Sequence, residues 1–94
     1  MSGEADALVE EIERLAEALA MTDDPDVVDF TLSFVRNYKD WVQVWEVQMG
    51  IDERDYGKAE AERRAAKRLY RDRLELRDCL KELLAWARQT GRMP

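Results

Sequence analysis

The sequence predicts an all-α fold, a three-helix antiparallel bundle or hairpin with a long C-terminal helix. Apolar residues recur at alternating steps of three and four along most of the chain, which is the spacing of one helix face. Pro25, Gly50 and Gly91 interrupt this spacing. No segment needs a strand to explain its pattern. We therefore expect residues 1–94 to form a single helical domain, with helices at about 4–21, 25–49 and 58–90.

The first helix is predicted from a narrow apolar stripe, as at the seam of a helix bundle. Its members are Ala5, Leu8, Ile12, Leu15 and Leu19. Ser2 is suited to cap the N-terminus of this helix. At the second helix, Asp24 is the expected cap and Pro25 the first helical residue. This helix is predicted to end at Gly50, a natural left-handed stop.

The third helix is predicted to follow a connection at residues 51–57, with Asp52 or Asp55 as its cap, and to stop at Gly91. At 1.5 Å per residue the three helices would be roughly 27, 37 and 50 Å long. Helices this unequal would leave part of the third helix uncovered. Either the third helix is broken, or a second chain covers the uncovered part. We expect the second chain, most simply in a two-fold homodimer.

Charge is distributed unevenly along the chain, which carries −6 overall. Residues 1–30 contain ten acidic residues and one basic residue, a net charge of −9. Residues 31–57 carry −2, and residues 58–94, with eleven basic and six acidic residues, carry +5. The acidic and basic thirds are expected to attract each other, within one chain or between chains, or to attract outside partners.

The residue content argues against an enzyme. The chain has no histidine, which removes the commonest general base and metal ligand. The carboxylate pairs Glu10/Glu13 and Glu75/Asp78 are interpreted as solvated helix surface, and Cys79 as a packed side chain. We expect no catalytic residue, no cofactor, no metal site and no small-molecule substrate.

A single cysteine excludes an intramolecular disulfide and is typical of a reducing compartment. Charged residues make up 38% of the sequence, and no apolar run approaches the ~18 residues of a spanning helix. We therefore expect a cytoplasmic protein with no membrane partner.

The main apolar stripe of the second helix consists of Val27, Phe30, Phe34, Val35, Tyr38, Trp41, Val42, Trp45 and Met49. Val44, Val47 and Leu32 lie off this stripe, so the helix is apolar on more than one side. A helix that is apolar on several sides is buried on several sides. Aromatic residues are also enriched where interfaces bind most strongly. The sequence therefore predicts a protein interface at Tyr38, Trp41, Val44, Trp45 and Val47.

Four basic residues form a predicted ridge on one side of the third helix, suited to charged docking or to a phosphate backbone. They are Arg64, Lys67, Arg68 and Arg71. The alternative is a solvated face whose charges are neutralised by i,i+4 pairs. The pairs available are Glu60–Arg64, Arg68–Asp72 and Arg71–Glu75.

These features favour a non-enzymatic helical interaction module: a small subunit, adaptor or inhibitor that forms a homodimer or docks on a larger protein partner. One alternative is a nucleic-acid-binding small subunit of a nucleoprotein complex that uses the basic ridge. A second alternative is an inhibitor whose acidic first helix mimics nucleic acid. The residues for that mimicry are Glu4, Asp6, Glu10, Glu11, Glu13 and Glu17.

Overall fold

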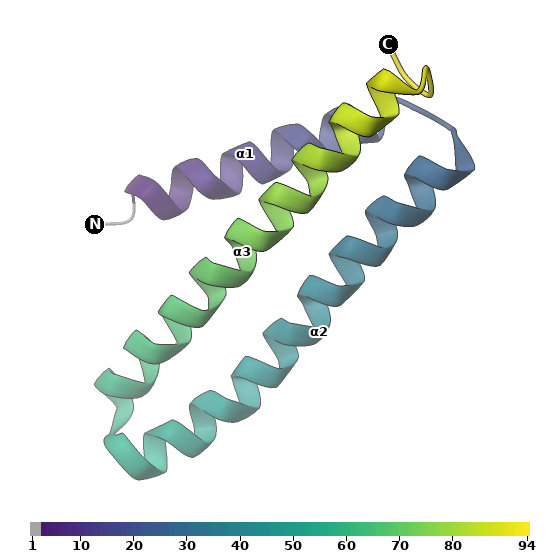
Figure 1. Cartoon of the computed structure of the whole chain (residues 1–94). Helices are drawn as coiled ribbons and strands as arrows, with labels where there is room; N and C mark the ends of the chain where they lie inside the picture. The colour runs from purple at the N-terminus through teal and green to yellow at the C-terminus, as the bar shows by residue number, and fades with distance from the viewer. Residues whose placement is uncertain (1–2) are drawn as a thin grey trace.

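The computed structural model describes residues 3–94, whose regular structure is entirely helical, so the predicted all-α, three-helix fold is confirmed. Helix α1 spans Gly3–Leu19, α2 spans Pro25–Tyr56 and α3 spans Lys58–Gln89. Helices α2 and α3 form a long antiparallel hairpin, and α1 lies beside α3 at the open end of that hairpin (Figure 1). The predicted cap Ser2 lies outside the described residues. Within residues 3–94, no helix combines the length and apolar character needed to cross a membrane.

The hydrophobic core lies at the open end of the hairpin, where all three helices meet. Leu19 of α1, Val27 of α2 and Leu80 of α3 are fully buried there. Ile12 and Leu15 of α1 pack against the same cluster. Full burial of a leucine or valine side chain contributes roughly 1.5–3 kcal/mol. The core therefore fixes α1 to the hairpin, mainly through α3.

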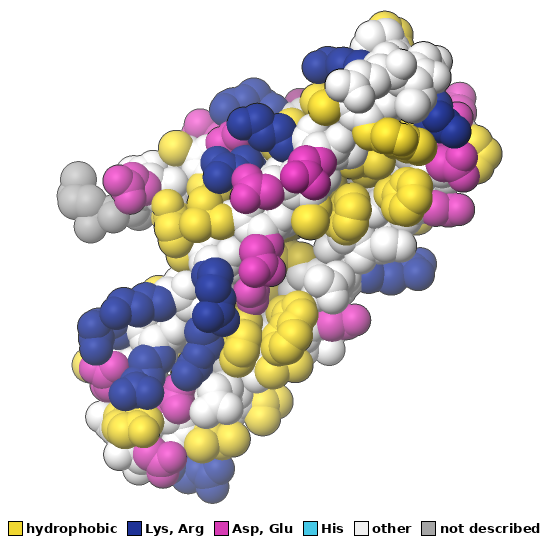
Figure 2. Space-filling view, in the orientation of Figure 1, with side chains coloured by type: hydrophobic (Ala, Val, Ile, Leu, Met, Phe, Trp, Pro, Cys, Tyr) yellow, Lys and Arg dark blue, Asp and Glu magenta, His cyan; other side chains and the backbone are white. Residues whose placement is uncertain are grey.

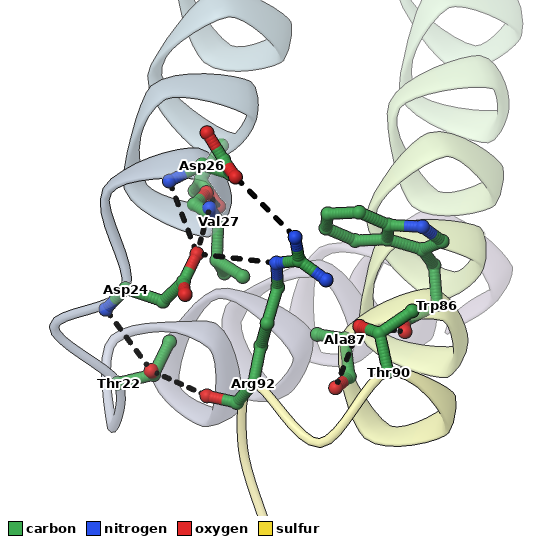
Figure 3. Close-up of polar contacts among 9 residues, drawn as sticks. Thr22, Asp24, Asp26, Val27, Trp86, Ala87, Thr90 and Arg92 are labelled. Atoms are coloured by element: carbon green, nitrogen blue, oxygen red, sulfur yellow. Dashed lines mark hydrogen bonds and ion pairs between the residues drawn. The ribbon is translucent and has the colours of Figure 1, made fainter.

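The start of α2 confirms the predicted cap (Figure 3). Asp24 Oδ1 accepts hydrogen bonds from the backbone N–H groups of Asp26 and Val27, at 3.1 and 3.2 Å. Pro25 occupies the first turn, where a backbone N–H is not needed. The loop between α1 and α2 is thereby held against the core beside Val27.

Arg92 joins the C-terminal tail to the start of α2 (Figure 3). Its guanidinium lies 3.5 Å from carboxylate oxygens of Asp24 and Asp26, and 4.3 Å from the ring centroid of Trp86. Its carbonyl oxygen accepts a hydrogen bond from the Thr22 hydroxyl at 2.9 Å. The chain reverses just before this point at Gly91, whose φ of 73° favours glycine. These contacts hold the C-terminal tail against the start of α2 at the open end of the hairpin.

The prediction that the second helix ends at Gly50 is wrong, because α2 continues to Tyr56. A glycine inside a helix costs only about 1 kcal/mol relative to alanine, which flanking contacts can offset. Here Gln48 donates a hydrogen bond to Asp52 across Gly50, and Asp52 pairs with Arg68 of α3. These contacts hold the last turns of α2 in helical form.

The hairpin turn is a single residue, Gly57, rather than the predicted connection at 51–57. Its φ of 88° lies in the left-handed region that glycine adopts without strain. The predicted caps Asp52 and Asp55 are both inside α2, and within residues 3–94 no side chain caps α3. The turn therefore depends on glycine conformation and not on a capping side chain.

Helix α3 is continuous from Lys58 to Gln89, and the observed helix lengths remove one reason for expecting a second chain. Helices α2 and α3 each have 32 residues, and α1 has 17. The part of α3 that extends past α1 is flanked by α2 along its whole length (Figure 1). Unequal helix length is therefore no longer a reason for a partner, and the case rests on the exposed side chains.

Alanine substitutions at Gly50 in α2 and at Gly57 in the turn should have opposite effects on the free energy of unfolding. Gly50→Ala should raise the free energy of unfolding by about 1 kcal/mol, because the position is helical and a methyl group there meets open space. Gly57→Ala should lower it by about 1–2 kcal/mol, because alanine is strained at that φ. Urea unfolding followed by circular dichroism measures both. A loss of stability in Gly50→Ala would contradict a continuous α2.

Candidate protein-interaction surface

One broad side of the hairpin faces away from α1 (Figure 1) and carries a second stripe of α2, in which five of the seven residues are apolar. We call this stripe the α2 seam. It consists of Phe30, Phe34, Asn37, Trp41, Val44, Gln48 and Ile51. The steps alternate between four and three, as in the contact positions of a coiled coil. Trp41 remains 44% exposed and Val44 47% exposed, so α3 does not cover the seam.

The five predicted interface residues divide into an inner pair and an outer three. Tyr38 and Trp45 point into the hairpin: the Tyr38 hydroxyl accepts a hydrogen bond from Arg73 Nε at 3.0 Å, and Trp45 Nε1 donates to Asp72. Their polar atoms are thus satisfied within the chain. Trp41, Val44 and Val47 are exposed, Val47 to 69%. The inner pair holds α2 to α3, and the outer three are available to a partner.

Trp41 is held in place although half of it is exposed. Its ring stacks on that of Trp45, with centroids 5.3 Å apart and planes 25° apart. Trp45 is itself fixed by its hydrogen bond to Asp72. A rigid, exposed aromatic ring loses little conformational entropy on binding, which suits it to a contact.

An open groove of about 490 Å³ adjoins the upper part of the seam. Phe30 and Phe34 line it from α2, and Trp86 and Glu82 line it from α3. The rings of Phe30 and Trp86 meet edge to face, with centroids 5.8 Å apart. Neither phenylalanine was among the predicted interface residues, because both lie on the main stripe of α2. Phe34 does pack against the core, whereas Phe30 is exposed. Their four-and-three spacing to Trp41 was the signal that could have placed them on the seam.

Cys79 lies beside this groove and next to three carboxylates. Burial raises the pKa of its thiol, and the negative charges of Glu82, Glu75 and Asp78 raise it further. Both effects disfavour the thiolate, which is the reactive form. The side chain acts as a small packed group at the edge of the groove.

The predicted basic ridge is divided between paired and unpaired residues. Arg64 contacts Glu60 at 3.0 Å and lies 3.9 Å from the ring centroid of Tyr56. Arg68 contacts Asp52 at 2.8 Å, where Asp52 is buried. Lys67 and Arg71 are exposed, and neither forms an ion pair in the described part of the chain. Half of the ridge therefore stabilises the hairpin.

The three expected i,i+4 pairs have different outcomes. Glu60–Arg64 forms. Arg68 turns to Asp52 across the hairpin instead of to Asp72, whose carboxylate accepts from Trp45. No ion pair joins Arg71 to Glu75 among residues 3–94. The charges of Arg71 and Glu75 are consequently left facing solvent.

The acidic first third meets the basic last third within the chain at two places. Glu11 of α1 lies 3.3 Å from Arg77 of α3, and Asp24 and Asp26 lie near Arg92. The remaining acidic residues of α1 are exposed, including Glu4, Asp6, Glu10, Glu13 and Glu17. Across residues 3–94, no three cysteine or carboxylate side chains come together as a metal site would require.

Asp52 should make folding stability depend on acid pH. Hydrogen bonds from Arg68 and then Gln48 hold the pKa of Asp52 below its ordinary value of 3.8. A lowered pKa contributes stability above the ordinary value, and this contribution is lost as pH falls through the folded-state pKa. Asp52→Asn should therefore be less stable than the native chain near neutral pH. The difference in urea midpoint should shrink as pH falls below 3.8. A difference that persists unchanged in acid would argue against this ion pair.

No family model, no curated protein and no solved structure matches this chain. The assignment of a function therefore rests on the geometry of the hairpin and its exposed side chains.

Proposed function

We propose that this protein is a protein–protein interaction module that acts by binding alone, through the face of the hairpin opposite α1. The observation that carries this proposal is the exposed α2 seam. A solvated helix ordinarily carries polar residues on the side away from its core. Here that side carries Phe30, Trp41, Val44 and Ile51, all of them exposed.

Further features of the face support binding to a protein. Hydrophobic side chains run along the boundary between α2 and α3, with charged side chains beside them on α3 (Figure 2). Contiguous exposed apolar patches with a polar rim mark interaction sites. Trp41 and Trp86 supply large rigid rings of the kind enriched at binding hot spots. A partner helix laid along the seam would meet contacts at every turn.

The nucleic-acid alternatives receive less support from the geometry. Arg64 and Arg68 of the basic ridge already hold carboxylates of their own chain. Glu75 and Glu82 follow within the next turns of α3, where they would repel a phosphate backbone laid along the helix. For the mimicry alternative, Glu11 of α1 is paired with Arg77. Neither alternative accounts for the apolar seam.

Site-specific photocrosslinking in cells tests the proposal. A benzophenone amino acid in place of Val44 should form a covalent adduct with another protein chain, either a different protein or a second copy. The same amino acid in place of Lys39, exposed on another side of α2, is the matched control. Equal and weak adducts at both positions would contradict the proposal.

Val44→Asp should separate binding from folding. With the photocrosslinker at Val47, this substitution should remove the adduct, because a carboxylate in an apolar contact is costly. The free energy of unfolding should change by no more than about 0.5 kcal/mol, since Val44 is exposed in the single chain. Circular dichroism during urea unfolding checks the second expectation. An adduct that survives Val44→Asp would place the contact elsewhere.

A further inference from the structure

Six charged residues form a column along α3 at the same four-and-three spacing as the α2 seam. We call it the charge column. Its members are Arg64, Arg68, Arg71, Glu75, Asp78 and Glu82. The three residues nearest the hairpin turn are positive and the three farther along are negative. The column therefore reverses its sign at its midpoint, near Arg73.

The charge column borders the α2 seam on the same face. Arg68 lies 5.2 Å from the ring centroid of Trp45, and Glu75 lines a small cavity with Trp41 and Phe34. Glu82 lines the open groove with Phe30. In Figure 2, basic side chains gather over the half of α3 nearest the turn and acidic side chains lie over its middle.

The midpoints of the seam and the column lie at nearly the same level of the hairpin. The seam from Phe30 to Ile51 is centred on Trp41. Trp45 bonds to Asp72 and Tyr38 to Arg73, so the middle of the column lies level with the segment of α2 around Trp41. A half-turn about an axis at this level would place the two seams against each other, and the positive half of each column against the negative half of the other.

From this self-complementarity we infer that the occupant of the face is a second copy of this chain, packed face to face and antiparallel. This inference rests on the proposed function and names the partner. In that arrangement Arg71 faces the partner's Glu75, Arg68 faces the partner's Asp78, and Arg64 faces the partner's Glu82. The two seams meet with Trp41 near the two-fold axis. Each charge contact then occurs twice, as an isologous interface requires.

The sign reversal discriminates against other occupants. A uniformly basic helix would be repelled by Arg64, Arg68 and Arg71, and a uniformly acidic helix by the opposite half of the column. Two copies packed in parallel about a two-fold axis would place each charge column over the partner's apolar α2 seam, where its charges would lack opposite charges. A second copy in the antiparallel direction gives opposite charges to Arg71 and Glu75, the unpaired members at the axis. It also places Arg64 and Arg68, which hold Glu60 and Asp52 of their own chain, level with acidic residues of the partner.

The charges nearest the axis are available for this contact. Three members of the column form no ion pair within the described residues: Arg71, Glu75 and Glu82. The molecule measures 51 × 25 × 15 Å, so its broad side can supply the ~800 Å² per partner that a standard interface buries. Apolar contact along the seam supplies the attraction, and the column selects the direction.

Charge reversal at the axis tests this arrangement by light scattering and sedimentation. Arg71→Glu and Glu75→Arg should each weaken self-association by about tenfold or more, because each places like charges opposite each other at two positions. An equimolar mixture of the two variants should recover the native mass and affinity as a heterodimer, since every contact between their columns then joins opposite signs. The double variant Arg71→Glu/Glu75→Arg should also recover, because it exchanges the signs within one chain.

Lys81→Glu is the matched control, because Lys81 is exposed on α3 outside the column, and it should associate as the native chain does. A native chain that stays monomeric would overturn this inference, as would variants that are not rescued on mixing. The proposed function would survive either result if Val44 still crosslinked to a different protein. Absence of both crosslinking and association would remove the function and the inference together.

Discussion

A helix can bury only part of its circumference against one neighbour, and α2 carries apolar side chains on more of its circumference than α3 covers. Its inner side, with Val27, Tyr38 and Trp45, is occupied by α3 and the core. The second stripe, the α2 seam, lies on the side away from α1 and is largely exposed. The hairpin fixes this arrangement, because any rotation of α2 that buried the seam would expose the inner side.

The contacts that fix the rotation of α2 are mostly polar. Trp45 with Asp72, Tyr38 with Arg73, and Asp52 with Arg68 join the two long helices at successive levels. Each has a defined direction, whereas apolar packing tolerates small rotations. These three contacts also engage side chains within the chain, among them Arg68 of the basic ridge. They explain why only a subset of the aromatic and basic side chains is presented on the surface.

Periodicity and capping chemistry were enough to predict the helical class and the start of α2 at Asp24–Pro25. They failed at Gly50 because the interactions that carry α2 through it come from α3, sixteen residues beyond Asp52 in sequence. The same limit applies to the surface. The sequence placed Val44 and Val47 off the main stripe, but it placed Trp41 on that stripe together with Tyr38 and Trp45. It could not show that Trp41 is exposed while Tyr38 and Trp45 bond to Arg73 and Asp72 of α3. Local spacing shows which side chains share a helix face, and it does not show which face α3 takes.

Electrostatics and apolar contact have separate roles in this account. The seam provides attraction without direction, and the charge column provides direction with little net attraction, because exposed ion pairs contribute about 0.2–1 kcal/mol each. The antiparallel direction is a geometric property of the dimer, and a distance between the two copies measures it. Spin labels at Lys58→Cys, in a Cys79→Ser background, mark the hairpin turn of each chain for pulsed electron resonance. In the antiparallel dimer the two turns lie about 45 Å apart, from roughly fifteen residues on each side of the axis at 1.5 Å per residue. A short distance between the two turns, or no distance between chains at all, would contradict it.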